Sequence, residues 1–288
     1  MSDESRSVAF VGLGRMGRAM AGCVIDHGFE VALFDPAPVE FDALVDRVPG
    51  RVRVATSPAD AASTADVIDV VVNTDAQALD ALLGVDGVFS GARSGTVVLV
   101  HSTIGHDTLR ELARAGDAAG VHVLDASISG SLGERSVGDL VLMVGGDAAS
   151  FATAEPVLQT YGGMVLHLGP LGAGLDMKLA LNLIRYLTYL ASHEAVRLAT
   201  EAGIDADTLR TIVQYVGASN MVGDFSRNRV AEDHPRRTNN WETARKDLGA
   251  AVARGRELDV DLSTAEFAID QMHRLWALDE SGRDRSSL

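Results

Sequence analysis

Short apolar runs rich in β-branched residues alternate with amphipathic stretches through the first part of the chain. Seven runs predict strands, at Val8–Val11, Val31–Phe34, Val67–Val72, Thr96–Val100, Val121–Leu124, Leu140–Val144 and Met164–Leu168. Between several of them, helical spacing predicts helices at Met16–His27, Asp107–Ala119 and Ala148–Leu158. Continuous apolar runs are typical of strands buried on both faces, as in a parallel sheet. The alternation predicts a doubly wound α/β domain over residues 1–168.

The strand signals stop after Gly169 and Pro170, and helical patterns follow. No proline or glycine interrupts residues 175–201, which predicts one helix over about Ala173–Glu201. At 1.5 Å per residue such a helix is about 45 Å long, enough to join two domains. Further helices are predicted at Asp205–Val213, Trp241–Glu257 and Ser263–Leu278. We therefore predict an all-α C-terminal domain, residues 169–288, joined to the α/β domain by a long helix.

Length and charge limit the classes of function. With 288 residues the chain has the length of two domains, at roughly 150 residues each. Its net charge of −15 argues against nucleic acid and anionic membranes as partners. No apolar run approaches the ~20 residues of a membrane span, and the polar, acidic start of the chain is unlike a signal peptide. We therefore expect a cytoplasmic protein.

Cysteine and histidine usage limits the chemistry further. The single cysteine, Cys23, excludes an internal disulfide framework and a cysteine-based zinc site. The eight histidines are scattered without the spacing of metal ligands. No metal site is therefore predicted.

A glycine-rich turn follows the first predicted strand, with the sequence Gly12-Leu13-Gly14-Arg15-Met16-Gly17. This spacing, between a buried strand and a helix, is the fingerprint of a Rossmann-type dinucleotide-binding domain. Gly12 permits the tight turn, Gly14 lets the backbone approach a pyrophosphate, and Gly17 lets helix and strand pack closely. The helix N-terminus supplies amide donors for phosphate, and Arg15 adds a cation. All six residues are candidate cofactor contacts; an ordinary glycine-rich turn is the alternative.

Asp35 ends the second predicted strand, 23 residues after Gly12. A carboxylate at this position accepts hydrogen bonds from the ribose hydroxyls of NAD and repels the 2′-phosphate of NADP. No arginine lies within the next several residues to bind that phosphate. We therefore predict NAD rather than NADP as the cofactor. The alternative is a strand-terminal aspartate that starts a turn with Pro36.

Lys178, Asn182, Arg185 and Tyr189 share one face of the predicted long helix, whose other residues around them are mostly apolar. Buried polar groups without partners cost about 1–3 kcal/mol each, so this face predicts partners or a cavity. A lysine such as Lys178 can donate or accept a proton, because desolvation or a nearby cation lowers its pKa. Asn182 can orient a hydroxyl or a carbonyl. The pair favours hydride transfer at an alcohol carbon; a solvated stripe is the alternative.

Five segments carry motifs in a fixed order. They are Val8–Ala21, Ser102-Thr103, Asp125–Ser131 continuing to Gly138–Gly146, the pattern Gly172-x-Gly174-x-x-x-Lys178-x-x-x-Asn182, and Lys246-Asp247-Leu248. One match alone would be unspecific, but five in this order and spacing resemble the β-hydroxyacid dehydrogenase family, which includes 3-hydroxyisobutyrate dehydrogenase. The resemblance covers nearly the whole chain.

The resemblance implies a role for each matching residue. Lys178 matches the family's catalytic lysine, and Asn182 matches the asparagine that holds the substrate. The segment Ser129-Gly130-Ser131 matches the loop that binds the substrate carboxylate through backbone amides and a hydroxyl. Thr103 and Lys246 match positions that contact the cofactor. The resemblance also implies a homodimer or homotetramer with the helical domain as interface, and an active site in the interdomain cleft.

Some positions depart from the family pattern. The family's Met-Leu-Pro after the fourth strand is Val71-Val72-Asn73 here, and its asparagine four residues further is Gln77. We expect Val72, Asn73 and Gln77 to contact the cofactor in a loop of different shape. Ser127 and Ser131 replace the family's proline and second glycine in the carboxylate-binding segment. These changes leave the lysine and asparagine intact and bear on the identity of the substrate.

Residues and resemblance together predict an oxidoreductase that transfers a hydride between NAD(H) and a small 3-hydroxy acid or the matching semialdehyde or keto acid. Lys178 takes the hydroxyl proton in oxidation and returns a proton to the carbonyl oxygen in reduction. An imine reductase on the same fold is one alternative, although its proton donor is usually not a lysine at this position. A non-catalytic NAD-binding module is the other, although it needs neither Lys178 nor Asn182.

Arg185 lies about one turn beyond Asn182 on the same helix face. There it can meet a second anionic group of the substrate, which would favour a diacid or a phosphorylated or sulfonated hydroxy acid. The alternative is an arginine paired with Glu194 or with a neighbouring subunit. A small anionic substrate is expected with either interpretation.

Overall fold

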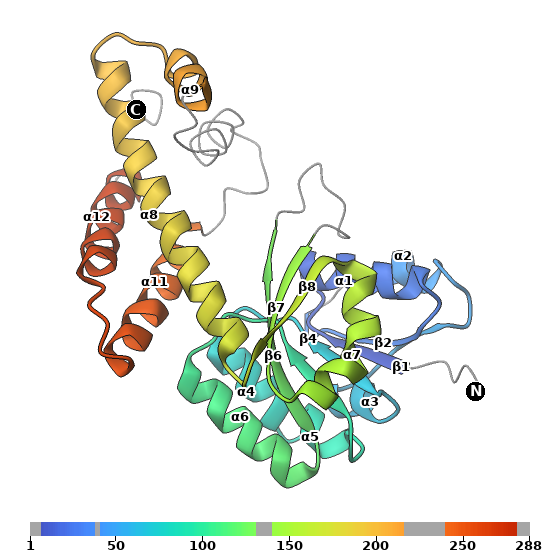
Figure 1. Ribbon diagram of the computed structural model, residues 1–288. Coiled ribbons are helices and arrows are strands. Elements are labelled where there is room, and N and C mark those ends of the chain that lie inside the picture. The colour runs from blue at the N-terminus through green and yellow to red at the C-terminus, as the bar shows by residue number, and fades with distance from the viewer. Residues whose placement is uncertain (1–6, 38–40, 131–139, 216–239, 281–288) are drawn as a thin grey trace. The chain divides into compact units, whose positions relative to one another are not determined.

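The structure is a computed structural model that describes residues 7–37, 41–130, 140–215 and 240–280 (Figure 1). The chain divides into two compact units, Met1–Lys178 and Leu179–Leu288, each with a hydrophobic core of its own. The boundary falls inside helix α8, Ala173–Glu201, so the first turns of that helix belong to the first unit. The functional division at residue 168 stays a prediction.

Strands and helices alternate along the first unit, as the apolar pattern predicts. Its strands are β1 Ser7–Val11, β2 Glu30–Phe34, β3 Val52–Val54, β4 Val67–Val70, β5 Val97–Val100, β6 His122–Ser129, β7 Leu140–Gly145 and β8 Gly162–Gly169. Its helices before α8 are α1 Arg15–Asp26, α2 Asp42–Val45, α3 Pro58–Ala62, α4 Asp75–Leu83, α5 Val88–Gly91, α6 His106–Ala119 and α7 Ala148–Tyr161.

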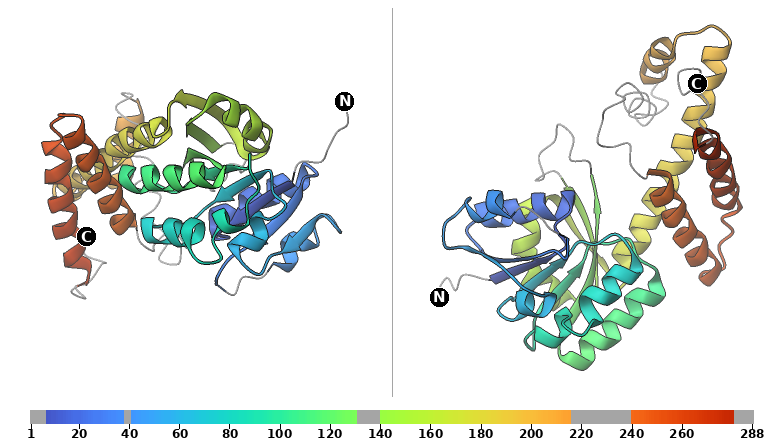
Figure 2. Two further views of the ribbon diagram at one scale, coloured as in Figure 1. Left: turned by 90° about the horizontal axis from the view of Figure 1, so that it is seen from below. Right: turned by 180° about the vertical axis from the view of Figure 1, so that it is seen from behind.

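One sheet contains all eight strands, in the order β3-β2-β1-β4-β5-β6-β7-β8. The six strands β1 to β6 are parallel and have the spatial order of a Rossmann-type sheet. Helices α1, α2 and α7 pack on one face, and α3, α4, α5 and α6 pack on the other (Figures 1 and 2). This architecture confirms the predicted fold class.

Strand β7 departs from the predicted parallel arrangement, because it runs antiparallel to β6. Only ten residues, 130–139, separate the two strands. A parallel connection needs a dozen or more residues, usually a helix, so this segment is too short for one. Strand β8 follows through α7 and is parallel to β7. Strands β7 and β8 therefore run opposite to the other six.

Strand β3 and the short helices α2 to α5 were not predicted. In β3, Arg51 and Arg53 alternate with Val52 and Val54, so the segment lacks a continuous apolar run. The strand lies at the sheet edge, where one partner strand is enough and burial on both faces is not required. The four helices have four to nine residues, too few to show a helical period.

A buried polar network joins the centre of the sheet to α7. The Asp69 Oδ1 atom accepts a hydrogen bond from the Tyr161 hydroxyl at 2.6 Å and lies 2.7 Å from His101 Nε2. His101 Nδ1 donates to the carbonyl oxygen of Ala126 at 2.7 Å. All three side chains are buried, and Asp69 Oδ2 has no hydrogen-bond partner within the described ranges. Loss of another donor to the Asp69 carboxyl group is therefore expected to lower the free energy of unfolding.

Replacing Tyr161 with phenylalanine is expected to lower the free energy of unfolding by about 1–3 kcal/mol, because Asp69 loses a buried donor. Cofactor affinity should stay unchanged, since Tyr161 ends α7 inside the core. Urea denaturation measures the first quantity and cofactor titration the second. Tyr215→Phe is the matched control, because the Tyr215 side chain is 92% exposed. Equal stability of the two variants would contradict the assigned role of the network.

The described part of the second unit is helical. It contains the remainder of α8, α9 Ala206–Tyr215, α11 Asn240–Glu257 and α12 Ser263–Glu280. Helices α11 and α12 pack together and onto α8, with Leu190, Leu248 and Val252 in their shared core (Figure 1). None of the described helices of either unit is both long and apolar enough to cross a membrane.

Candidate active site

The predicted site residues of the first unit gather at one edge of the sheet, where the parallel strands end. Gly12 follows β1, Asp35 follows β2, Val72 comes shortly after β4, Thr103 follows β5, and Ser129 is the last residue of β6. Strands β1 and β4 are neighbours, so the chain changes direction across the sheet between them. Open α/β sheets bind ligands outside the carboxyl ends of their strands at this point.

The glycine loop has the geometry that a pyrophosphate requires. Gly12 has a φ of +97°, and a Cβ there would collide with the carbonyl oxygen of Val71. Gly17 packs against the carbonyl oxygen of Gly12, which likewise leaves no room for a side chain. At Gly14 no heavy atom lies within 4 Å of a Cβ position, so the backbone is open to a ligand. These three glycines therefore fit the roles predicted for them.

Leu13 and Met16 point their side chains into the core, so any cofactor contact from them comes from the backbone. Helix α1 begins at Arg15 without a side-chain cap, which leaves first-turn amides available to an anion. A cavity of about 570 Å³ adjoins the loop and is lined by Leu13, Gly14, Arg15, Arg18, Ala19, Ala43, Leu44 and Arg47. Arg47 is paired with Asp26 and Arg18 donates to the Leu13 carbonyl, so the role predicted for Arg15 toward phosphate stays a prediction.

The contacts of Asp35 are compatible with both interpretations that the sequence left open, a ribose contact and a turn after the strand. Its Oδ2 accepts the Leu13 N–H at 2.6 Å, which ties the glycine loop to the end of β2. Its Oδ1 accepts the Ala37 N–H at 2.9 Å, which closes a turn after the strand. Each carboxylate oxygen retains lone pairs for a further donor. Asp35 can thus hold the turn and still accept hydrogen bonds from ribose hydroxyls.

The loop after β4 is held by its neighbours. The Val72 N–H donates to Ser102 Oγ at 3.2 Å, and Ser102 Oγ donates to the Val72 carbonyl at 2.6 Å. The Asn73 N–H donates to Gln77 Oε1 at 2.9 Å, while the Gln77 N–H donates to Thr74 Oγ1. Gln77 therefore helps to cap α4, and its Nε2 is the group left for a cofactor contact. Ser102 in turn fixes the start of the segment that carries Thr103.

Lys178 lies beside the end of β6. Its Nζ donates to the Ile128 carbonyl oxygen at 2.6 Å, directly before Ser129 and Gly130. Gly130 is exposed and has a φ of +138°, a backbone conformation that favours glycine. Ser131, the third member of the predicted carboxylate-binding segment, lies outside the described residues. The first unit thus brings the predicted acid–base group and the start of that segment together.

Asn182 lies in the second unit, with its side chain buried against α11. Its Nδ2 donates to Asp247 Oδ2 at 2.8 Å, and the Tyr186 hydroxyl donates to the same oxygen at 3.2 Å. Burial and the neighbouring Asp247 carboxylate raise the pKa of Tyr186, which keeps its hydroxyl a donor. Asn182 Oδ1 is buried and has no hydrogen-bond partner in the described part of the chain. The Asn182 side chain is thus held through its Nδ2 donor, while its Oδ1 acceptor could still bind a ligand.

Arg185 and Lys246 are the remaining predicted residues. Arg185 Nε donates to the Tyr189 hydroxyl at 3.2 Å, and its guanidinium lies 5.5 Å from the centre of that ring. The sequence suggested Glu194 or a neighbouring subunit as alternative partners, and the contact with Tyr189 on the same helix was not predicted. Lys246, on α11, has its Nζ 3.5 Å from Asp247 Oδ1. Roles in substrate and cofactor binding remain predictions for these two side chains.

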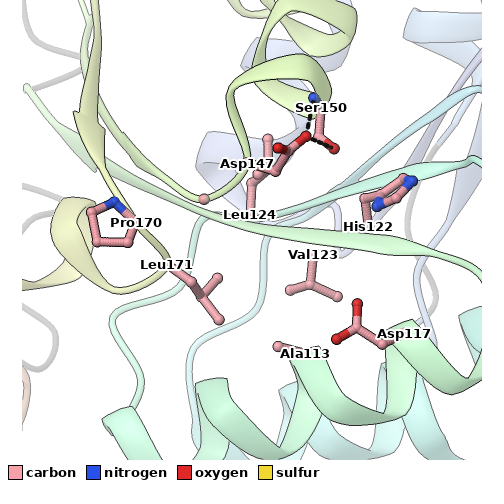
Figure 3. Close-up of a pocket in the computed structure, with 10 residues that line it drawn as sticks. Ala113, Asp117, His122, Val123, Leu124, Asp147, Ser150, Pro170 and Leu171 are labelled. Atoms are coloured by element: carbon pink, nitrogen blue, oxygen red, sulfur yellow. Dashed lines mark hydrogen bonds between the residues drawn. The ribbon is translucent and has the colours of Figure 1, made fainter.

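A second cavity, of about 330 Å³, lies at the opposite edge of the sheet (Figure 3). It is lined by Ala113, Asp117, His122, Val123, Leu124, Gly146, Asp147, Ser150, Pro170 and Leu171. The predicted site residues that the structure describes are absent from this lining, so the cavity is separate from the candidate site. Within the described ranges, no group of three or more His, Cys, Asp or Glu side chains can hold a metal ion.

Several polar residues around the site were not predicted to have a role. Asp125 contacts the start of α8, His106 lies 2.9 Å from Asp176, and Asp247 holds Asn182 and Tyr186. Asp125 and Asp247 stand inside recognised motifs, but their partners lie 47 to 65 residues away along the chain.

The composition of the chain singles out Lys178 and Lys246, because they are the only lysines among 25 basic residues. Arginine stays protonated in proteins, whereas lysine can titrate.

Models of two protein families match consecutive parts of the chain. Residues 7–169 match the NAD binding domain of 6-phosphogluconate dehydrogenase, which is more than half of the chain. Residues 172–288 match the NAD-binding domain of NADP-dependent 3-hydroxyisobutyrate dehydrogenase. The chain belongs to the β-hydroxyacid dehydrogenase family. As a member of this family it is an NAD(P)-binding oxidoreductase of the class that acts on CH–OH groups.

Similar proteins support the family assignment. An uncharacterized oxidoreductase of Mycobacterium tuberculosis is 31% identical over 93% of this chain and 92% of its own length. Human mitochondrial 3-hydroxyisobutyrate dehydrogenase is 33% identical over 73% of this chain and 63% of its own. The crystal structure of 3-hydroxyisobutyrate dehydrogenase from Salmonella typhimurium has a TM-score of 0.83, at 28% identity over 96% of this chain and 95% of that one. Imine reductases, at 18% to 23% identity and TM-scores of 0.63 to 0.66, share the fold.

Proposed function

We propose that this β-hydroxyacid dehydrogenase transfers a hydride between NAD(H) and a small 3-hydroxy acid, or the matching semialdehyde or keto acid, with Lys178 as general acid and base. The observation that carries the proposal is the position of the Lys178 amine, 2.6 Å from the Ile128 carbonyl at the carboxyl edge of the sheet. The glycine loop and Asp35 belong to that same edge. The amine is therefore near the edge at which a bound dinucleotide is expected.

The bond to Ile128 also fixes how Lys178 can act. One N–H of the amine points at a carbonyl, and a carbonyl only accepts. The substrate oxygen is proposed to contact the same nitrogen. In oxidation the neutral amine takes the hydroxyl proton, and in reduction the ammonium returns a proton to the carbonyl oxygen. Bound NAD(H) supplies the hydride acceptor or donor.

The buried Oδ1 of Asn182, which has no hydrogen-bond partner in the described part of the chain, supports the proposal. A buried acceptor without a partner is costly, and a substrate hydroxyl that donates to Asn182 Oδ1 would remove that cost. The donor half of the amide is already held by Asp247. Asn182 lies one helical turn after Lys178 on α8, so both side chains start from the same helix face. We assign to Asn182 the binding of the substrate hydroxyl.

The substrate carboxylate is assigned to the segment that follows β6. Ser129 and Gly130 lie next to the carbonyl that binds Lys178, which puts backbone amides and one hydroxyl near the amine. Ser131 completes the segment, and Arg185 is proposed for substrates with a second anionic group. Thr103 and Lys246 are proposed as cofactor contacts, together with the glycine loop, Asp35, Val72, Asn73 and Gln77. Asp35 supports NAD over NADP, because a 2′-phosphate beside a carboxylate is repelled.

A substrate panel tests the proposal directly. Purified protein is assayed with 3-hydroxy acids, semialdehydes and diacid, phosphorylated or sulfonated hydroxy acids, each with NAD(H) and with NADP(H). Turnover of at least one 3-hydroxy acid with preference for NAD is expected. Cyclic imines are the discriminating arm, because reduction of imines without turnover of any hydroxy acid would favour the imine reductase alternative. Lack of preference for doubly charged substrates would remove the role of Arg185.

A homodimer or homotetramer is also proposed. Large apolar side chains are exposed on the second unit, among them Ile184 at 61%, Leu198 at 74% and Phe267 at 60%. Exposed apolar side chains in such number support contact with another subunit. Light scattering on the purified protein measures the assembly, and a monomer at micromolar concentration would remove this part of the proposal.

A further inference from the structure

A distant carboxylate caps the helix that carries Lys178. Gly172, the residue before α8, has no side chain with which to cap the first turn. Asp125 on β6 takes this place: its Oδ1 accepts the Gly172 N–H at 2.6 Å and its Oδ2 accepts the Leu175 N–H at 2.7 Å. The Asp125 side chain is buried. Charge-assisted hydrogen bonds of this kind are short and strong, so they anchor the helix start to β6.

Glycines make the space that this carboxylate needs. A Cβ on Gly145 would meet Asp125 Oδ1, and a Cβ on Gly174 would meet Asp125 Oδ2 at 2.8 Å. Gly172 has a φ of +96°, a conformation that other residues rarely adopt. Of the two glycines of the Gly-x-Gly-x-x-x-Lys pattern, Gly174 leaves room for the Asp125 carboxylate and the Met143 carbonyl, and Gly172 supplies the N–H that Asp125 accepts. The pattern therefore marks a helix start that Asp125 can anchor, on the helix that carries Lys178.

A side chain of α6 also contacts this turn of α8. His106, the first residue of α6, has its Nε2 2.9 Å from Asp176 Oδ1, two residues before Lys178. The titratable groups on and around this turn are Asp125 on β6, His106 on α6, and Asp176 and Lys178 on α8. Burial raises the pKa of Asp125, whereas the amides of Gly172 and Leu175 and the charge of His106 act in the opposite direction. The carboxyl group is thus held by donors on the helix it anchors.

Strand β6 and the first turns of α8 run side by side in the same direction. Asp125 contacts Leu175, and three residues later on each element Ile128 accepts the hydrogen bond from Lys178. The helix is therefore attached to the strand at two levels. The first attachment fixes the backbone, and the second fixes the amine. Loss of the attachment at Asp125 would let the start of α8 shift and would move the Lys178 amine away from the Ile128 carbonyl.

We propose that Asp125 is the positioning residue of the Lys178 amine: it sets the place of the amine by anchoring α8 on β6, and so keeps the hydrogen bond to the Ile128 carbonyl that favours the protonated amine. This inference rests on the proposed role of Lys178 as acid and base. Asp125 itself touches neither substrate nor cofactor in this scheme. It acts through the helix.

Asp125→Asn tests the proposal with little change in side-chain size. One carboxylate oxygen becomes an NH₂ group that faces a backbone N–H, and the charge is lost. We expect kcat to fall about 10- to 100-fold, as a displacement of about 1 Å can cost 10²-fold. The dissociation constant for NAD(H) should change less than twofold, and the acid limb of the kcat–pH profile should move to lower pH. The assay uses the best substrate of the panel.

Asp147→Asn is the matched control, because Asp147 caps α7 by accepting the Ser150 N–H at 2.9 Å. The same chemistry is then removed from a helix that carries no predicted catalytic group. A loss of stability with unchanged kcat and pH profile is expected for this variant. Should Asp125→Asn fail to fold, Asp176→Asn replaces it, because it weakens the contact between α8 and His106. Its expected effect is a loss of kcat in the same direction but several-fold smaller.

Acetylation of Lys178 gives a readout that needs no turnover. The protein is treated with acetic anhydride over a range of pH, and modification is followed by mass spectrometry. Lys246 is the only other lysine and serves as internal reference. In Asp125→Asn the midpoint pH for Lys178 should fall relative to that for Lys246, whereas Asp147→Asn should match the wild type.

The two readouts separate the failure of this inference from the failure of the proposed function. A wild type that turns over no compound of the panel contradicts the proposed function, and the acetylation midpoint still decides the role of Asp125. A folded Asp125→Asn with kcat within twofold of wild type and an unmoved midpoint overturns the inference. So does a fall in kcat that Asp147→Asn reproduces.

Discussion

Replacing Lys178 with alanine is expected to lower kcat by about 10²- to 10⁴-fold, the usual contribution of a general acid or base. Affinity for NAD(H) should remain within about twofold, because the residues proposed to bind the cofactor, the glycine loop and Asp35, belong to other elements. The physical reason is that the hydroxyl proton then has no acceptor at the end of β6, where the Lys178 amine now lies. Initial rates of NADH formation measure kcat, and fluorescence titration measures cofactor affinity.

Lys178→Arg separates acid–base chemistry from charge. Arginine keeps the positive charge but does not release its proton near neutral pH, so this variant should be nearly as impaired as the alanine variant. Lys246→Arg is the corresponding change at the other lysine and should lower kcat by less than tenfold, since Lys246 is assigned to cofactor contact. Unchanged kcat in Lys178→Ala would remove the proposed role of the amine.

Replacing Asp35 with alanine is expected to reduce the preference for NAD over NADP by about 10²-fold in kcat/KM. Hydrogen bonds to a charged acceptor contribute about 1.5–3 kcal/mol each, and one such bond lost to a ribose hydroxyl corresponds to roughly that factor. The repulsion of a 2′-phosphate is removed at the same time. Because Asp35 also accepts the Leu13 N–H, NAD affinity should fall while NADP affinity stays constant or rises.

Asp66→Ala controls for the loss of a carboxylate that accepts a backbone N–H. Asp66 Oδ2 accepts the Ser7 N–H at 3.1 Å, just before β4 begins at the opposite edge of the sheet. This variant should lose stability and keep the cofactor preference of the wild type. Kinetics with both cofactors test both variants. A wild type that already prefers NADP would show that the interpretation of Asp35 is wrong.

Local features of the chain were predictable from the sequence. The glycine loop depends on residues that are neighbours in sequence, between a strand and a helix whose apolar patterns are strong. The shared helix face of Lys178 and Asn182 also follows from spacing alone, and α8 has the predicted bounds. The fold class followed because strand and helix patterns alternate over a long stretch.

Features that depend on distant pairing were not predictable. Asp125 stands in a recognised motif, but its two amide partners lie 47 and 50 residues further on. Asp69, His101 and Tyr161 come from three separate elements, and their sequence neighbours give no sign of a shared network. The short edge strand β3 lacks an apolar run because it pairs on one side only. In each case the contact is decided by tertiary packing rather than by local pattern.

The single reversal of strand direction at β7 decides which edge of the sheet Lys178 reaches. Because β7 and β8 run opposite to β6, β8 ends at the edge where β6 begins, and α8 starts there. The helix then travels along β6 from Asp125 toward Ile128 and delivers the amine to the carboxyl edge. Had β7 kept the direction of its neighbours, the same helix would start at the cofactor edge and carry its lysine away from it. A connection too short for a crossover thus sets the direction of the helix that carries Lys178.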